Sequence, residues 1–259
     1  MFNSRRSIAL ILGLFALAGQ PETRAMAQGS LVMLPGVEEG SSIFRALALA
    51  FREEAEGLLT VPPPIGSGNA VADVIADRAE FARINRALFA HERAAGLDAL
   101  PVFDSPVLVL AHTSVSRRTF SVAEIEALRD GKIRNWRSLG GNEMPVRFAM
   151  LQDAGFERPG KTMSERSDFL RSRDVEAVVR RVPGSIGLVP GPVFGEADIT
   201  ERQVENLSIR EENYPLRSTT WLVYRPQSLS PEARRFLTFL HSARARDLAQ
   251  AQRARWLIR

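Results

Sequence analysis

Short apolar runs alternate with stretches of helical periodicity along most of the chain. An apolar run at 31–34 is followed by apolar positions that recur every three or four residues over 44–55. The same order returns at once, with an apolar run at 58–61 before helix-spaced positions in 71–75. Two successive strand-then-helix units predict an α/β fold with parallel strands.

The pattern changes near the middle of the chain. The apolar run at 106–111 is typical of a buried strand, and the polar, aperiodic residues 112–118 after it predict a crossing into a second lobe. Ser121 and Glu124 form a capping-box pattern at the start of a short helix. Further strands are expected at 80–88, 145–150, 185–189 and 219–224, and further helices at 164–170, 174–181, 231–240 and 244–255.

A length of 259 residues with 45% hydrophobic residues suits one large domain or two lobes of about 100 residues each. The strand at 219–224 is expected to carry the chain back to the first lobe. The predicted organisation is a signal peptide at 1–27, lobe one at 28–111, lobe two at 112–212, and a return to lobe one with C-terminal helices at 213–259.

The first residues have the features of a secretory signal peptide. Arg5 and Arg6 precede a short apolar run at 8–18, and Ala25-Met26-Ala27 is a small-residue cleavage pattern. The apolar run is too short to span a membrane. The arginine pair fits either the twin-arginine route or an ordinary charged start. We expect a soluble mature protein in the periplasm, with cleavage after Ala27.

Charge and composition exclude several classes of function. Cleavage after Ala27 lowers the formal net charge from +4 to +2, and the arginines are scattered among acidic residues, so no nucleic-acid partner is expected. The chain has no cysteine, its three histidines lie in separate segments, and it lacks a Gly-x-Ser-x-Gly motif. We therefore expect no metal, no cofactor and no enzymatic activity.

The glycine-rich stretch Gly66-Ser67-Gly68-Asn69 is the first candidate site. Glycines allow close approach of the backbone to a ligand, Ser67 or Asn69 can cap the following helix, and free N–H groups at a helix start attract anions. An ordinary turn with a helix cap is the alternative. Gly40-Ser41-Ser42 also precedes a helix, so both loops can face one crevice beyond the strand ends.

Asn85 follows the strand candidate that begins at residue 80. Its position at the end of this strand fits either a polar group that faces the crevice or a surface residue in a turn.

The order of these motifs resembles the PstS-type phosphate-binding members of the type II periplasmic substrate-binding proteins. The segment from Ser121 to Gly141 is the most specific, with its helix, turn, Gly-Lys-Ile and Asn-Trp at family spacing. The resemblance is carried by 66–69, 80–88, 120–136, 184–188 and 214–216.

The resemblance implies a two-lobe type II periplasmic-binding-protein fold with crossing hinge strands, and a ligand clamped between the lobes. In phosphate-binding members, helix-start donors in both lobes, an arginine and a proton-accepting carboxylate hold the anion. Lobe one is a plausible match: Gly40, Ser41 and Ser42 correspond to the first loop, and Ser67 and Gly68, followed by Asn69, to the second. Asn85 stands where phosphate binders often have Ser or Asp. Lobe two departs from the pattern, because Leu151 occupies the arginine position and the Ser-Gly-Thr helix start is missing. Arg158 is a substitute from a shifted position or an exposed loop residue.

Two functions follow from this resemblance. The first is an exported, monomeric solute-binding protein that captures phosphate or a related oxyanion for the membrane subunits of an ABC importer. The alternative is a PstS-like domain that has lost transport and acts as a periplasmic sensing or interaction partner, which the altered second-lobe loop favours.

Overall fold

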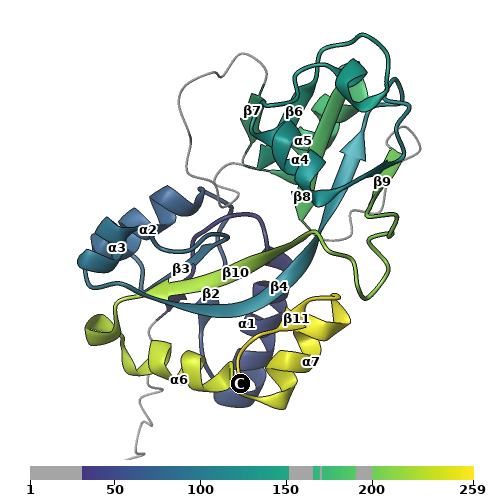
Figure 1. Cartoon of the computed structure of the whole chain (residues 1–259). Helices are drawn as coiled ribbons and strands as arrows, with labels where there is room; N and C mark the ends of the chain where they lie inside the picture. Colours follow the sequence, from purple (N-terminus) through teal and green to yellow (C-terminus); the bar gives the residue numbers. More distant parts are fainter. Residues whose placement is uncertain (1–30, 152–165, 170, 191–199) are drawn as a thin grey trace, which may run out of the picture.

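The computed structural model describes residues 31–151, 166–169, 171–190 and 200–259. Figure 1 shows two α/β lobes joined by long strands that run from one lobe into the other. The predicted signal peptide and the predicted loop at 152–161 lie outside the described residues. No helix in the described part of the chain is long and apolar enough to cross a bilayer.

The first lobe is built from both ends of the chain. Strand β10 lies between β3 and β4 and is antiparallel to both, while β1 and β2 form a parallel pair beside them. Its elements are β1 (Val32–Met33), α1 (Ser41–Ala55), β2 (Leu59–Thr60), α2 (Ser67–Ile75), β3 (Phe81–Ile84), α3 (Ala90–Ala94), β4 (Asp98–Ala111), β10 (Arg217–Tyr224), η2 (Pro226–Ser228), α6 (Pro231–Phe239), α7 (Ala243–Ala251) and β11 (Arg255–Trp256).

The second lobe continues the same sheet in the order β4-β8-β6-β7, in which β6 is parallel to both of its neighbours. Strand β4 belongs to both lobes, because its first half pairs with β10 and its second half pairs with β8 and β9. The elements of this lobe are β5 (Thr119–Phe120), α4 (Val122–Arg129), η1 (Trp136–Leu139), β6 (Arg147–Leu151), β7 (Arg166–Phe169), α5 (Ser172–Arg181), β8 (Ser185–Pro190) and β9 (Thr200–Val204).

Each lobe has a large hydrophobic core of its own. In the first lobe, Phe51 packs edge-on against Phe236, with 5.3 Å between the ring centroids, and this contact joins α1 to the C-terminal helices. In the second lobe, buried Trp136 packs against Phe120 and donates from Nε1 to the carbonyl of Gly184 at 2.8 Å. The Asn-Trp motif of the resemblance is therefore a structural anchor of the second lobe.

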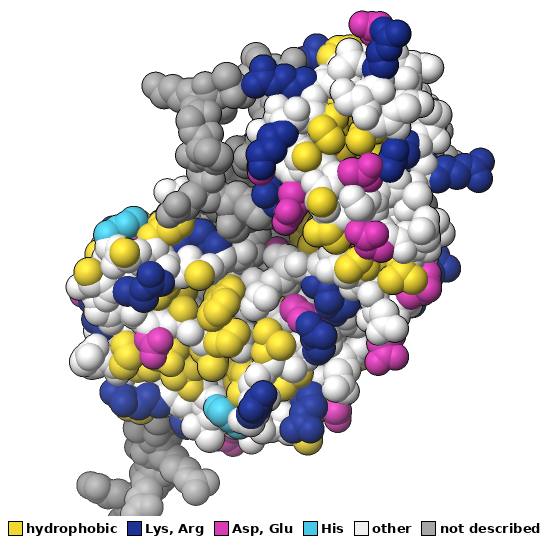
Figure 2. Space-filling view, viewed as in Figure 1, with side chains coloured by type: hydrophobic (Ala, Val, Ile, Leu, Met, Phe, Trp, Pro, Cys, Tyr) yellow, Lys and Arg dark blue, Asp and Glu magenta, His cyan; other side chains and the backbone are white. Residues whose placement is uncertain are grey.

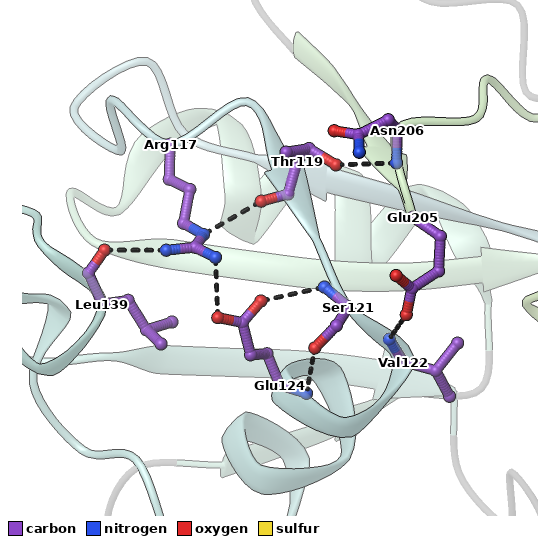
Figure 3. A network of polar contacts seen from close by, with 8 residues as sticks. All are labelled: Arg117, Thr119, Ser121, Val122, Glu124, Leu139, Glu205 and Asn206. Carbon is purple, nitrogen blue, oxygen red and sulfur yellow. Dashed lines mark hydrogen bonds and ion pairs between the residues drawn. The ribbon is translucent and has the colours of Figure 1, made fainter.

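Helix α4 is fixed by polar contacts that the sequence predicted in part (Figure 3). Ser121 Oγ accepts from the Glu124 N–H at 3.1 Å and the Glu124 carboxylate accepts from the Ser121 N–H at 2.8 Å, which confirms the capping box. Arg117 binds the same carboxylate at 2.6 Å and the carbonyl of Leu139 at 2.9 Å. Glu205 accepts from the Val122 N–H at 3.0 Å. These contacts give α4 a defined position beside the second-lobe sheet.

Two helix predictions were wrong where the chain forms strands. Residues 166–169, predicted as part of a helix, form β7, which pairs in parallel with β6. The last helix ends at Ala251, and β11 then pairs with β4. In both places, pairing with a distant strand overrides the local helical pattern.

Candidate functional site

A cleft of about 410 Å³ lies between the two lobes. Figure 2 shows the hollow there, where hydrophobic and charged side chains lie next to one another. Its first-lobe wall includes Glu39, Asn85 and Ser218, and its second-lobe wall includes Val122 on α4 and Leu188 on β8. The cleft is thus lined by both polar and apolar side chains.

Glu39 is the central polar group of the first-lobe wall. Its side chain is buried, with 3% of the residue exposed, and its Oε2 accepts from Asn85 Nδ2 and from Ser218 Oγ, each at 3.1 Å. Its other oxygen, Oε1, has no hydrogen-bond partner in the described part of the chain. Burial raises the pKa of Glu39 from 4.5 to about 6, while the two hydrogen bonds lower it.

Arg83 holds the loop that carries Glu39. It is fully buried on β3 and donates from Nε to the carbonyl of Val37 at 2.8 Å, and from Nη1 to that of Leu34 at 3.2 Å. Its Nη2 donates to Ser41 Oγ at 2.9 Å. Burial lowers the pKa of Arg83 to about 9, a value at which the guanidinium is still charged at neutral pH. One side chain therefore satisfies several acceptors of the β1–α1 loop and positions it against β3.

The arginines of the cleft wall are already paired with acidic side chains. Arg86 makes a bidentate ion pair with buried Glu92, with both N–O distances at 2.7 Å. Arg217 lies 2.6 Å from Asp104, and Arg129 pairs with the adjacent Asp130 at 2.9 Å. Within the described residues, the cleft wall thus offers no arginine that lacks an acidic partner.

A second carboxylate of the same loop connects the two lobes. Glu38 Oε2 accepts a hydrogen bond from the backbone N–H of Ser172, the first residue of α5. A carboxylate at a helix N-terminus is favoured by the helix dipole. The loop that carries Glu38 and Glu39 therefore contributes to the cleft wall and also contacts the opposite lobe.

The serine of the glycine-rich loop lies behind the cleft wall. Ser67 is fully buried and its Oγ donates to Asn85 Oδ1 at 3.4 Å, so a chain of hydrogen bonds runs from Ser67 through Asn85 to Glu39. Asn85 is buried and lines the cleft, which rules out the surface-turn interpretation. The predicted side-chain cap of α2 was wrong, because Gly66 is its N-cap residue, with φ 85°, and no side chain caps it.

The other predicted residues are less directly placed at the cleft. Gly40 is the N-cap of α1 with φ 71°, Ser41 Oγ is bonded to Arg83, and Ser42 is exposed. Gly68 and Asn69 are exposed on the first turn of α2, where Asn69 Nδ2 donates to the Ile65 carbonyl at 2.8 Å. Arg158 lies outside the described residues. Their role in ligand binding remains a prediction.

Sequence reasoning missed Glu39, Arg83 and Ser218. Arg83 had a local signal, since it is a charged residue within the apolar stretch 81–84. Glu39 and Ser218 had none, because they are 179 residues apart and meet only when β10 joins the first lobe. No group of acidic or histidine side chains within the described residues is arranged to hold a metal ion.

Comparison with solved structures shows the fold. A phosphate ABC transporter substrate-binding protein candidate from Clostridium perfringens, solved with bound phosphate, aligns with a TM-score of 0.73 at 20% identity, covering 88% of this chain and 100% of that one. An ABC-type phosphate transport receptor from Vibrio cholerae aligns with a TM-score of 0.68 at 16% identity over 88% of this chain and 100% of the other. The predicted type II periplasmic-binding-protein fold is confirmed.

A comparison of sequences identifies a specific relative. The phosphate-binding protein PstS of Bacillus subtilis is 24% identical over 208 residues, which cover 72% of this chain and 65% of the Bacillus protein, just under two thirds of its length. No family model matches the chain. The chain is thus similar in sequence to PstS and in fold to phosphate-transport binding proteins, which agrees with the resemblance that the motifs predicted.

Proposed function

We propose that the chain is an exported solute-binding protein that captures a phosphate-like oxyanion between its two lobes for an ABC importer. The observation that carries this proposal is the buried carboxylate of Glu39 at the cleft wall, with one oxygen that lacks a partner among the described residues. The PstS-like relatives support an oxyanion as the solute. The proposal includes removal of residues 1–27, a periplasmic location, a monomer and no enzymatic activity.

The geometry favours an oxyanion that carries a proton. A P–OH group can donate to Glu39 Oε1, while a fully deprotonated oxyanion such as sulfate would place two acceptors against each other. The arginines of the described wall are paired with acidic side chains, so a shared proton is the available means of reducing repulsion between ligand and carboxylate. Selection of phosphate over sulfate would follow from this single contact.

A thermal-shift panel with the mature chain, residues 28–259, tests the proposal. At a phosphate concentration of 100 times Kd, mass action stabilises the native state by about 2.7 kcal/mol. We expect phosphate at pH 7.5, where Glu39 is ionised and hydrogen phosphate still carries a proton, to raise the melting temperature and sulfate to leave it unchanged. Glu39→Gln should let sulfate raise the melting temperature too, because the amide nitrogen in place of Oε1 can donate to either anion; Glu53→Gln, an exposed acid on α1, is the matched control. A preference for phosphate over sulfate that is equal in the wild type and in Glu39→Gln would contradict the proposed role of Glu39.

A second candidate function is a periplasmic sensing or interaction partner without transport. The observation that favours it is that the protein's own carboxylates occupy donors that an anion could use: Glu39 takes those of Asn85 and Ser218, and Glu38 takes that of Ser172. A flat thermal response to every oxyanion in the panel would favour this second function.

A further inference from the structure

The size and lining of the cleft fit more than an inorganic ion. Pockets of about 300–1,000 Å³ with mostly hydrophobic walls and a few polar groups are typical of sites for organic molecules. The volume of about 410 Å³ lies in this range. A five-atom oxyanion at Glu39 would leave most of this space to water against apolar side chains.

The apolar part of the cleft comes from both lobes. Its residues belong to α4, to the end of β8, to the segment that enters β10 and to β10 itself: Val122, Ile125, Leu188, Leu216 and Trp221. Because these side chains share one cavity with Glu39, a ligand bound at the carboxylate and extended along the cleft would bury an apolar substituent.

Leu188 is the apolar residue of the cleft whose side-chain direction is best defined. A Cβ atom at the preceding residue, Gly187, would lie 2.7 Å from side-chain atoms of both Val175 and Val179, so that position of β8 faces α5. Successive residues of a strand point to opposite faces. Leu188 therefore points away from α5, and it is half-buried where it lines the cleft.

We propose that the solute is an organic oxyacid, a phosphonate or phosphate monoester whose protonated oxygen donates to Glu39 and whose apolar substituent packs against Leu188 and the other apolar residues of the cleft. This inference rests on the proposed function, since it assigns the substrate class of the same site. Phenylphosphonate is a suitable probe, because its phosphonate group carries the oxygen that donates to Glu39 and its phenyl ring is an apolar substituent bonded directly to phosphorus.

Isothermal titration calorimetry of the mature chain at pH 6 with phenylphosphonate, methylphosphonate and inorganic phosphate tests the inference. We expect phenylphosphonate to bind at least about tenfold more tightly than inorganic phosphate, because transfer of apolar surface out of water adds to the contact with Glu39. Equal or weaker binding of phenylphosphonate would overturn the inference and leave the proposed function in place. Failure of all three probes to bind would overturn both.

Two variants test the proposed contact between Leu188 and the apolar substituent. Leu188→Ala should lower the ratio of phenylphosphonate affinity to methylphosphonate affinity by about threefold or more, because it shortens the side chain that meets the substituent. Leu207→Ala is the matched control, since Leu207 is a half-buried leucine that packs on the same second-lobe core and does not line the cleft. An equal change of the ratio in both variants would overturn the assignment, and so would binding of benzylamine in place of phenylphosphonate.

Discussion

Replacing Glu39 by glutamine is expected to stabilise the protein at neutral and alkaline pH. The pKa of Glu39 is raised from 4.5 to about 6 because the carboxylate is buried. The ionised form is therefore less stable in the native protein than in the unfolded chain. One pKa unit corresponds to about 1.4 kcal/mol. Burial of Glu39 therefore lowers the free energy of unfolding by about 2 kcal/mol at a pH where the carboxylate is ionised in both the native and the unfolded protein. Glutamine keeps an acceptor oxygen for Asn85 and Ser218 but carries no charge.

The sign of the pH dependence follows from proton binding. Between pH 4.5 and about 6, the native state holds a proton on Glu39 that the unfolded chain has released, so the free energy of unfolding falls as the pH rises. Below this window Glu39 is neutral in both states and contributes nothing. Above about pH 6 the ionised Glu39 destabilises the native protein by the full amount. The advantage of Glu39→Gln should therefore grow from below about 1 kcal/mol at pH 5 to about 2 kcal/mol at pH 8.

Urea denaturation of the wild type and the variant at pH 5, 6, 7 and 8, in buffers free of phosphate and other oxyanions, measures this difference. Glu53→Gln is the control, because it makes the same chemical change at an exposed position on α1. A stability difference between wild type and Glu39→Gln that stays constant from pH 5 to pH 8 would refute the reasoning.

Three further changes test other features of the structure. Arg83→Met should lower the free energy of unfolding by about 3 kcal/mol, because it removes the guanidinium that donates to the buried carbonyls of Leu34 and Val37. The control is Arg78→Met, which should change this free energy by less than about 0.5 kcal/mol in the same denaturation assay, because the Arg78 side chain is 63% exposed. Glu38→Gln should weaken the contact between the lobes by about 1 kcal/mol, seen as a larger radius of gyration in small-angle scattering without solute; an unchanged radius would contradict this role. Gly187→Ala should cost about 1–3 kcal/mol in thermal or urea unfolding, since its methyl group would meet two α5 valines at 2.7 Å, whereas Gly68→Ala, where an added Cβ meets nothing within 4 Å, should be neutral or slightly stabilising.

Local features of the fold were predictable from the sequence. The capping box at Ser121 and Glu124 formed as predicted because both partners lie within one turn of α4. The order of strands and helices also gave the correct fold class, since the strand–helix alternation restricts the topology. The exception at 166–169 shows the limit, because the partner of β7 is a strand that lies more than a dozen residues earlier in the chain.

The candidate site was predictable only where one segment carries the signal. Asn85 was predicted as a cleft residue because it lies directly after a strand, and the structure places it in the cleft wall; its role in ligand binding stays a prediction. Glu39 could not be assigned, because its burial depends on Ser218 and Asn85 from two other segments. The sequence shows a glutamate in a loop, while the raised pKa and the unpartnered oxygen are properties of the assembled lobe.

The position of β10 in the sheet has a consequence for the biogenesis of the chain. This strand separates β3 from β4, yet it is encoded after the whole second lobe. A nascent polypeptide that has emerged from the ribosome only as far as residue 216 lacks the central strand of its N-terminal sheet, and that sheet cannot close. Native structure in this lobe must therefore wait until β10 has been synthesised, so the N-terminal half-sheet stays incomplete throughout synthesis of the second lobe.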